Sequence, residues 1–194
     1  MNRASIAGVI LAAGASSRMG QPKALLEYEG ETFVHRLARI LDEVCGRVVV
    51  VVGFDGERVR AASPSTATVI ENPAPERGML SSLQCGLRQI MDADAAIFLP
   101  VDYGAVRRET LAAVAAEPAD AQIVVPEFDG RHGHPVRLSR AIVAELLALP
   151  HTAQAREVIR RNRDVTRYLR VDDLGVITDV DEPEDYRALV EAMP

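Results

Sequence analysis

Five short and almost uninterrupted hydrophobic runs follow one another along the chain. They cover Ile6 to Ala13, Val48 to Val52, Thr68 to Ile70, Ala96 to Leu99 and Ile123 to Val125. Runs of this kind are typical of strands that are buried on both faces, as in a parallel sheet. The pattern therefore predicts five strands in the interior of the protein.

Between these runs, hydrophobic residues recur at intervals of three and four, which gives a helix one apolar face. The spacing is clear in two segments and weaker in a third: Phe33, Leu37, Ile40, Leu41 and Val44; Leu83, Leu87, Ile90 and Met91; Leu111 and Val114. Strands that alternate with helices are joined by right-handed crossovers. We therefore expect an α/β fold, a Rossmann-like three-layer α/β/α sandwich around a mostly parallel sheet.

The alternation changes after Pro126. The segment EFDGRHGHPVRL contains two glycines and a Gly-His-Pro step between apolar residues, which predicts a hairpin or a small antiparallel excursion. Further on, we expect helices over residues 140–149 and 153–161, a strand near 167–171 and a last helix from Pro183. The length suits one domain that spans residues 1–194.

Composition narrows the class of protein. Hydrophobic residues make up 48% and charged residues 26% of the chain, the balance of a soluble globular protein. The net charge of −6 argues against a protein that binds nucleic acid through a basic face. No apolar segment approaches the roughly 20 residues that span a membrane. Cys45 and Cys85 lack the spacing of a disulfide framework or zinc site, which fits a reduced, cytoplasmic setting.

Residues that directly follow the predicted strands are the first candidates for a site, because ligands of such sheets gather at the carboxyl ends of the strands. The loop after the first strand reads LAAGASSRMGQPK and combines small residues with Arg18 and Lys23. Backbone N–H groups of a small-residue loop can approach a phosphate closely. The glycines are too far apart for a P-loop, and the dinucleotide pattern G-x-G-x-x-G is absent, which argues against a nicotinamide-dependent oxidoreductase.

This loop resembles the signature L-A-A-G-x-S-x-R-M-G-x-x-K of the nucleotidyltransferases related to molybdenum-cofactor cytidylyltransferase and guanylyltransferase. Four further segments are similar to motifs of that family, in the same order: NPAPERGMLSSLQCGL from Asn72, LPVDYGAV from Leu99, GRHGHPVRL from Gly130 and DVDEPEDY from Asp179. The chain departs from the family in one place. Many relatives carry a proline shortly after the aspartate of the third motif, where this chain has Tyr103, Gly104 and Ala105.

The resemblance implies transfer of a nucleoside monophosphate from a nucleoside triphosphate to a phosphorylated acceptor. It gives Lys23 the α-phosphate and Arg18 the departing pyrophosphate, where cations stabilise developing charge. Asp102 and Asp181 are expected to hold Mg²⁺, which favours one or two carboxylates together with phosphate oxygens. The expected catalytic residues are thus Arg18, Lys23 and Asp102. The expected nucleotide-binding residues are Leu11, Ala12, Ala13, Gly14, Arg18, Lys23, Asn72, Gly78 and Ser82.

On the acceptor side, the resemblance implies that Gly133, His134 and Pro135 form a wall of the pocket. Relatives that use guanine usually read L-A-G-G where this chain has Ala13, so its methyl group favours the smaller base of CTP. The resemblance implies an acceptor that is molybdopterin or another phosphorylated metabolite, and a partner enzyme that receives the product. A guanylyltransferase, a sugar-phosphate nucleotidyltransferase and a nucleotide-binding module without turnover remain as alternatives.

The same residues also have structural interpretations. Isolated cations such as Arg18 and Lys23 are commonly solvated surface residues, and an aspartate directly after a strand, such as Asp102, commonly forms a turn. Serines at positions 81 and 82 commonly begin a helix. The acidic residues around Pro183 suit a helix N-terminus, because negative charge there complements the helix dipole.

Overall fold

The computed structural model describes residues 5–150 and 152–192, so both ends of the expected domain 1–194 lie outside the described residues. Its main sheet has eight strands: β1 (Ile6–Ala12), β4 (Arg47–Val52), β5 (Thr68–Glu71), β6 (Ala95–Pro100), β7 (Ile123–Phe128), β8 (Arg131–His132), β9 (Val136–Ser139) and β10 (Thr166–Arg170). The strand order is β10-β7-β9-β6-β1-β4-β5, with β8 paired to β7. All five predicted strands are confirmed.

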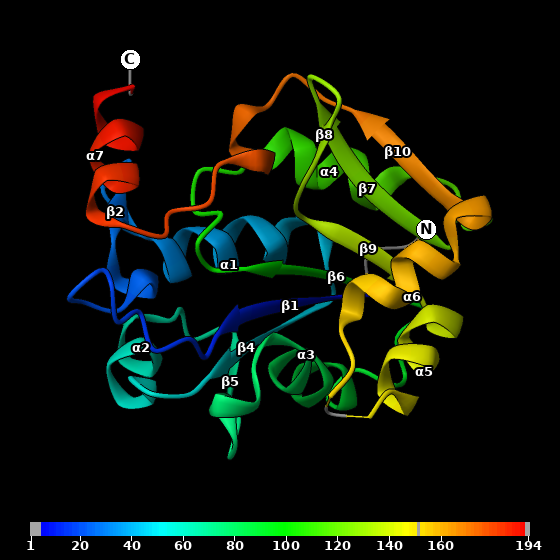
Figure 1. Ribbon diagram of the computed structural model, residues 1–194, viewed down its shortest axis with the longest axis horizontal. Coiled ribbons are helices and arrows are strands. Elements are labelled where there is room, and N and C mark those ends of the chain that lie inside the picture. Colours follow the sequence, from blue (N-terminus) through cyan, green and yellow to red (C-terminus); the bar gives the residue numbers. More distant parts are fainter. Residues whose placement is uncertain (1–4, 151, 193–194) are drawn as a thin grey trace.

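Helices cover both faces of the sheet (Figure 1). One face carries α1 (Phe33–Val44), α2 (Gly56–Ala62) and α4 (Arg108–Ala116), and the other α3 (Met79–Arg88), α5 (Arg140–Ala148) and α6 (Ala155–Arg161). The last helix, α7 (Pro183–Glu191), stands beside the small hairpin of β2 (Glu27–Tyr28) and β3 (Glu31–Thr32). Single turns of 3-10 helix are η2 (Lys23–Leu25), η3 (Pro75–Arg77), η4 (Arg163–Val165) and η5 (Leu174–Ile177). The predicted three-layer architecture is confirmed.

Each face of the sheet has its own hydrophobic core, and β1 contributes to both. Ile10 belongs to the core that contains Leu37 of α1, whereas Val9 belongs to the core that contains Leu83 of α3. Successive side chains of a strand point to opposite faces. Burial on both faces therefore explains the uninterrupted hydrophobic sequence of this strand.

The segment after Pro126 forms the antiparallel part of the sheet. Strand β8 pairs with β7, and β9 lies between β6 and β7, antiparallel to both. Val136, at the start of β9, is opposite Phe98 near the carboxyl end of β6. This register places residues 133–135 at the same edge of the sheet as the loop after β1.

A few boundaries differ from the expectations. Helix α3 ends at Arg88, so Ile90 and Met91 lie beyond it, and Met91 is 63% exposed. The prediction that the helix includes Ile90 and Met91 is wrong, because the hydrophobic spacing continues beyond the last helical turn. Helix α6 begins two residues later than expected, and α2 and the β2–β3 hairpin were not predicted. No helix in the described ranges is long and apolar enough to cross a membrane.

Candidate active site

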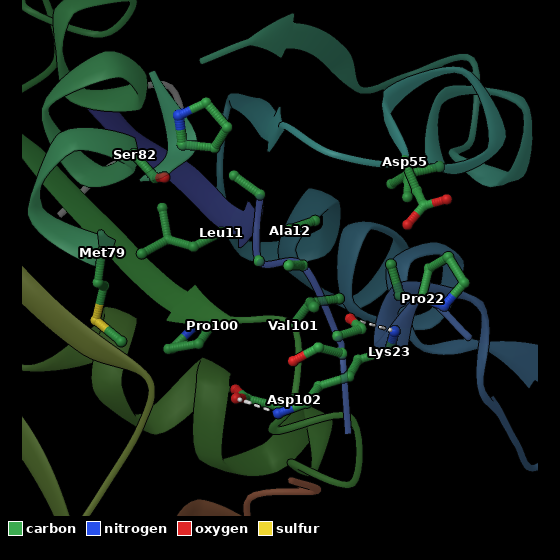
Figure 2. Close-up of a pocket in the computed structure, with 18 of the residues that line it drawn as sticks. Leu11, Ala12, Pro22, Lys23, Asp55, Met79, Ser82, Pro100, Val101 and Asp102 are labelled. Atoms are coloured by element: carbon green, nitrogen blue, oxygen red, sulfur yellow. Dashed lines mark hydrogen bonds and ion pairs between the residues drawn. The ribbon is translucent and has the colours of Figure 1, made fainter. Parts of the chain in front are cut away.

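A cavity of about 280 Å³ opens at the carboxyl ends of β1 and β6 (Figure 2). Its walls come from the loop after β1, the start of α3 and the turn after β6. Figure 2 shows Lys23 reaching towards Asp102, with Met79 and Ser82 on the side away from Asp55. The cavity brings together most of the residues expected at the nucleotide and metal: Leu11, Ala12, Ala13, Gly14, Arg18, Lys23, Gly78, Ser82, Asp102 and Asp181.

Lys23 lies at the centre of a cluster of charges. Its Nζ is 3.4 Å from Asp102 Oδ2 and also donates to Asp181 Oδ1. The Arg18 guanidinium makes two ion pairs of 3.0 Å, one with Asp181 and one with Glu182. The Lys23 side chain is only 15% exposed, whereas that of Arg18 is 59% exposed. Lys23 is therefore held at the cavity wall, and Arg18 lies at its mouth.

The loop after β1 folds so that Lys23 faces the cavity. Ser16 has a positive φ of 48°, and its Oγ accepts a hydrogen bond of 3.0 Å from the Lys23 N–H. Gly20, with φ of 71°, adopts a conformation that favours glycine. The small residues also serve packing, because a Cβ on Gly53 would lie 2.7 Å from the carbonyl oxygen of Ala13. The loop is thus fixed by its own backbone and by β4.

Asp102 carries a partly buried carboxylate, 23% exposed, with incomplete hydrogen bonding. Its Oδ2 pairs with Lys23, but Oδ1 is buried and has no hydrogen-bond partner among the described residues. Burial raises the pKa of Asp102, Lys23 lowers it in part, and the carboxylates of Asp181 and Asp179 raise it again. A buried polar atom without a partner is costly. A cation at this position would supply the missing contact.

Asp181 stays more ionised than Asp102. The hydrogen bond from Lys23, with help from Arg18, lowers the pKa of Asp181 despite its partial burial. Both carboxylates contact the same Lys23 ammonium, and Mg²⁺ is commonly held by one or two carboxylates together with phosphate oxygens and water. Within the described ranges, no three His, Cys, Asp or Glu side chains converge to hold a metal ion by themselves. Asp102 and Asp181 are two carboxylates of the cavity that could contribute oxygen ligands to such an ion.

The acidic residues around Pro183 divide their roles between helix and site. Glu182 and Asp185 form a capping box at the start of α7, and Asp185 also accepts a 3.0 Å hydrogen bond from the Asp181 N–H. The Asp181 carboxylate takes no part in this cap and instead contacts Lys23 and Arg18. The helix N-terminus interpretation therefore applies to Glu182 and Asp185, and the carboxylate of Asp181 faces the cavity. Asp179 is exposed.

Asn72 does not line the cavity. It is 3% exposed, and its amide donates hydrogen bonds of 3.0 Å to the hydroxyls of Ser81 and Ser82. Its side-chain oxygen accepts from the Ala74 N–H. Asn72 thus ties the end of β5 to the first turn of α3, while Ser82 forms part of the cavity wall.

The expected acceptor residues Gly133, His134 and Pro135 do not line this cavity, although the His134 ring contacts Tyr103, the residue after Asp102. Gly133 allows close contact with η5, since a Cβ there would lie 1.7 Å from the Val176 carbonyl oxygen. The backbone N–H of His134 donates a hydrogen bond of 2.9 Å to that oxygen. The centre of the His134 ring lies 4.8 Å from the centre of the Tyr103 ring and 5.3 Å from that of Phe98. Burial lowers the pKa of His134 to about 4, so the ring is neutral at pH 7. Burial and neighbouring carboxylates raise the pKa of Tyr103 to about 12.

The sequence analysis did not select several residues of the cavity wall. Helix α2 supplies Val59 from a segment of seven residues with no clear apolar face, and the turn before it supplies Asp55. Glu182 was not selected as a partner of Arg18, although it follows Asp181 directly. The other unselected wall residues lie within three positions of selected ones: Ala15, Ser16, Ser17, Pro22, Ala24, Pro75, Met79, Pro100 and Val101.

Comparison with known proteins defines the class. The model of the MobA-like NTP transferase domain matches residues 8–166. The chain therefore belongs to the MobA-like NTP transferases, a family of nucleotidyltransferases.

Individual relatives have more specific names. The chain is 25% identical over 180 residues to the molybdenum cofactor cytidylyltransferase of Escherichia coli (strain K12), covering 92% of each protein. It is 27% identical over 130 residues to a probable molybdenum cofactor guanylyltransferase of Bacillus cytotoxicus, covering 66% of this chain and 64% of the relative. The crystal structure of Rv0371c from Mycobacterium tuberculosis H37Rv superposes with a TM-score of 0.85 and 30% identity, covering 99% of this chain and 100% of that one. A complex of Rv0371c with manganese superposes with a TM-score of 0.81 and 27% identity, covering 97% and 100%.

Proposed function

We propose that this protein is a Mg²⁺-dependent cytidylyltransferase. It transfers CMP from CTP to a phosphorylated small-molecule acceptor, such as molybdopterin, and releases pyrophosphate. The observation that carries the proposal is the cluster of Lys23, Asp102 and Asp181 at the wall of a cavity built from the loop after β1. Cations and carboxylates placed together at this edge of the sheet suit the binding of a triphosphate with a divalent metal.

In the proposed reaction, an oxygen of the acceptor phosphate forms a bond to the α-phosphorus of CTP. The bond from that phosphorus to the oxygen bridging to the β-phosphate breaks, and pyrophosphate leaves with the electron pair. Lys23 contacts the α-phosphate and Arg18 the pyrophosphate, where negative charge develops. The acceptor phosphate is already anionic, so positioning and charge neutralisation by these side chains account for the rate without a side-chain base.

Asp102 and Asp181 would hold the metal. The buried Oδ1 of Asp102, which has no partner in the described part of the chain, supports this assignment. The complex of Rv0371c with manganese supports a divalent ion in a protein of this fold. The metal would neutralise part of the charge of the triphosphate and keep its phosphates in register.

The preference for cytosine rests on the space next to Ala13. Ala13 lines the cavity, and its backbone and methyl group already lie against Gly53 and leave no room for a Cβ there. A side chain packed this closely has little freedom to move away from a larger base. The match to the cytidylyltransferase of E. coli over 92% of the chain agrees with this preference.

The proposal is tested by incubating the protein with Mg²⁺, each of CTP, GTP, ATP and UTP, and a panel of phosphorylated acceptors that includes molybdopterin. Pyrophosphate release should be largest with CTP. Lys23→Ala should abolish the signal, and Arg88→Ala, which removes an exposed cation of α3, should preserve it. Release with GTP alone would indicate a guanylyltransferase. Tight CTP binding without release in any combination would indicate a nucleotide-binding module.

A further inference from the structure

Helix α1 packs against the turn that follows Asp102. Gly104 lies so close to the ring of Phe33 that a Cβ on Gly104 would come within 2.3 Å of Phe33 Cδ1. Phe33 is fully buried, and Gly104 is buried as well. The turn that follows Asp102 is therefore packed closely against α1, with no room for a side chain at Gly104.

Arg36, one turn further along α1, holds the same turn by hydrogen bonds. Its Nη1 donates to the carbonyl oxygens of Gly104 at 3.0 Å and Val106 at 2.7 Å. Its Nε donates to Glu29 at 3.1 Å, and its guanidinium lies 5.2 Å from the centre of the Tyr28 ring. Arg36 is only 6% exposed. A buried guanidinium is tolerated when its donors are used, and here they are used on the turn next to the candidate metal ligand.

The position of Asp102 depends on this turn because the carboxylate itself has few contacts. Its backbone carbonyl accepts a 3.1 Å hydrogen bond from Val180, and its side chain pairs only with Lys23 among the described residues. Lys23 would move to phosphate when a nucleotide binds. The backbone on either side of Asp102, strand β6 before it and the turn at Gly104 after it, must then keep the carboxylate in place.

We infer that Arg36 is a positioning residue for the metal site: it fixes the turn at Gly104–Val106 and thereby the carboxylate of Asp102. This inference rests on the proposed role of Asp102. Groups that hydrogen-bond to a metal ligand commonly change metal affinity by about 10- to 100-fold when they are removed. Arg36 holds the backbone after the ligand rather than the ligand itself, so we expect an effect at the lower end of this range. Arg36 makes no contact with the cavity, so its effect should fall on the metal rather than on the nucleotide base.

The chain offers a matched control in Arg137. This arginine is 2% exposed and donates to the carbonyl oxygens of Glu117, Pro118 and Ala121, at 2.7, 2.8 and 3.1 Å. It fixes the turn that follows α4, outside the cavity. Arg36→Met and Arg137→Met each remove a buried guanidinium that bonds the carbonyl oxygens of a turn, and the turns differ. Arg36→Met also removes the contacts with Glu29 and Tyr28, neither of which lines the cavity.

The test measures binding of Mn²⁺ in the presence of CTP by water-proton relaxation. Arg36→Met should weaken Mn²⁺ binding about 10-fold and lower kcat by a similar factor, with the KM for CTP changed less than about twofold. Arg137→Met should leave the Mn²⁺ affinity unchanged, even if it lowers the melting temperature as much. Equal Mn²⁺ affinity in wild type and Arg36→Met, or equal losses in the two variants, would overturn the inference.

A milder variant keeps the test decisive if Arg36→Met does not fold. Arg36→Lys retains the charge, but a lysine cannot bond both carbonyls and Glu29 in the geometry of a guanidinium. It should weaken Mn²⁺ binding about threefold, and an unchanged affinity would contradict the inference. If the wild type binds Mn²⁺ but releases no pyrophosphate, the proposed function fails while the comparison still decides the role of Arg36. Wild type that binds no Mn²⁺ in the presence of CTP would overturn both.

Discussion

The two sides of the candidate site are held together in different ways. On the side proposed to bind the triphosphate, Lys23 and Arg18 are held by ion pairs with carboxylates, and the two cationic side chains are 15% and 59% exposed. On the side proposed to bind the acceptor, the segment at Gly133 and His134 is fixed by a backbone hydrogen bond to Val176 and by a contact at Gly133 that leaves no room for a Cβ. Partly exposed ion pairs can exchange one partner for another at a small cost in free energy. A closely packed backbone segment cannot move without losing its contacts.

The difference indicates a division of labour. Under the proposed function, the side with Lys23 and Arg18 presents cations that are paired with carboxylates and would pass to the triphosphate. The segment at Gly133 and His134 would keep its shape when ligands bind. Substitutions on the first side should therefore change turnover, and substitutions on the second should change stability.

The largest effect is expected at Lys23. Lys23→Ala should lower kcat by about 10²- to 10³-fold with a much smaller change in CTP affinity, because a cation placed for developing charge acts mainly in the transition state. Steady-state pyrophosphate release and equilibrium binding of CTP measure the two quantities separately. A variant with normal kcat and a raised KM would show that Lys23 binds the ground state and the transition state equally, with no particular role in the transition state.

A pair of glycine substitutions compares the two sides directly. Gly133→Ala should lower the free energy of unfolding by about 3 kcal/mol, because its Cβ would overlap the Val176 carbonyl oxygen. Gly14→Ala should leave stability nearly unchanged, because a Cβ there meets nothing within 4 Å, and should weaken CTP binding. Urea unfolding and CTP titration of both variants check this. Equal destabilisation by the two substitutions would remove the distinction between a rigid and an adaptable side.

The segment at Gly133 and His134 should also respond to pH. Burial lowers the pKa of His134 to about 4 in the folded state, below its ordinary value of about 6.5. The unfolded chain therefore binds more protons between these values, and His134 should reduce stability as the pH falls from about 6.5 to 4, by up to about 1.4 kcal/mol per pH unit.

Urea unfolding at several pH values, compared between wild type and His134→Gln, isolates this contribution. Between about pH 4 and 6.5, the free energy of unfolding should fall more steeply with decreasing pH in the wild type than in His134→Gln. His132→Gln, at a ring that is 46% exposed, controls for the loss of an imidazole on the neighbouring strand. Parallel slopes in wild type and His134→Gln would show that the His134 ring is not buried in its neutral form.

The smallest expected effect concerns the base. CTP should raise the melting temperature a few degrees more than GTP at equal concentration, because a tenfold tighter ligand adds about 1.4 kcal/mol of stability. Ala13→Gly should bring the melting-temperature shifts caused by CTP and GTP closer together. Equal shifts from CTP, GTP and ATP would leave the preference for cytosine without support.

The strands and the loop after β1 could be predicted from sequence because their determinants are local. Burial on both faces makes a strand continuously hydrophobic, and a phosphate loop needs small residues beside its cations. The resemblance to the nucleotidyltransferases also selected Asp181, which lies 79 residues beyond Asp102 and meets it at Lys23.

Other features could not be read from the chain. Arg36 looks like one more charge on the polar face of a helix, and only the fold shows that it is buried against the turn at Gly104. Asn72 was expected at the nucleotide, but its partners are two serines that the packing of α3 on β4 brings to it. Such contacts depend on tertiary packing, which a local pattern does not encode.

The most direct test of the site measures Mg²⁺-dependent transfer from CTP in three carboxylate variants, each with its melting temperature. Asp102→Asn and Asp181→Asn should lose transfer by more than about 100-fold while the melting temperature stays within a few degrees of the wild type. Asp179→Asn removes an exposed carboxylate of the same segment and should cost far less. If Asp181→Asn retains activity and lowers only the melting temperature, Asp181 belongs to the helix N-terminus and the proposed metal site is wrong.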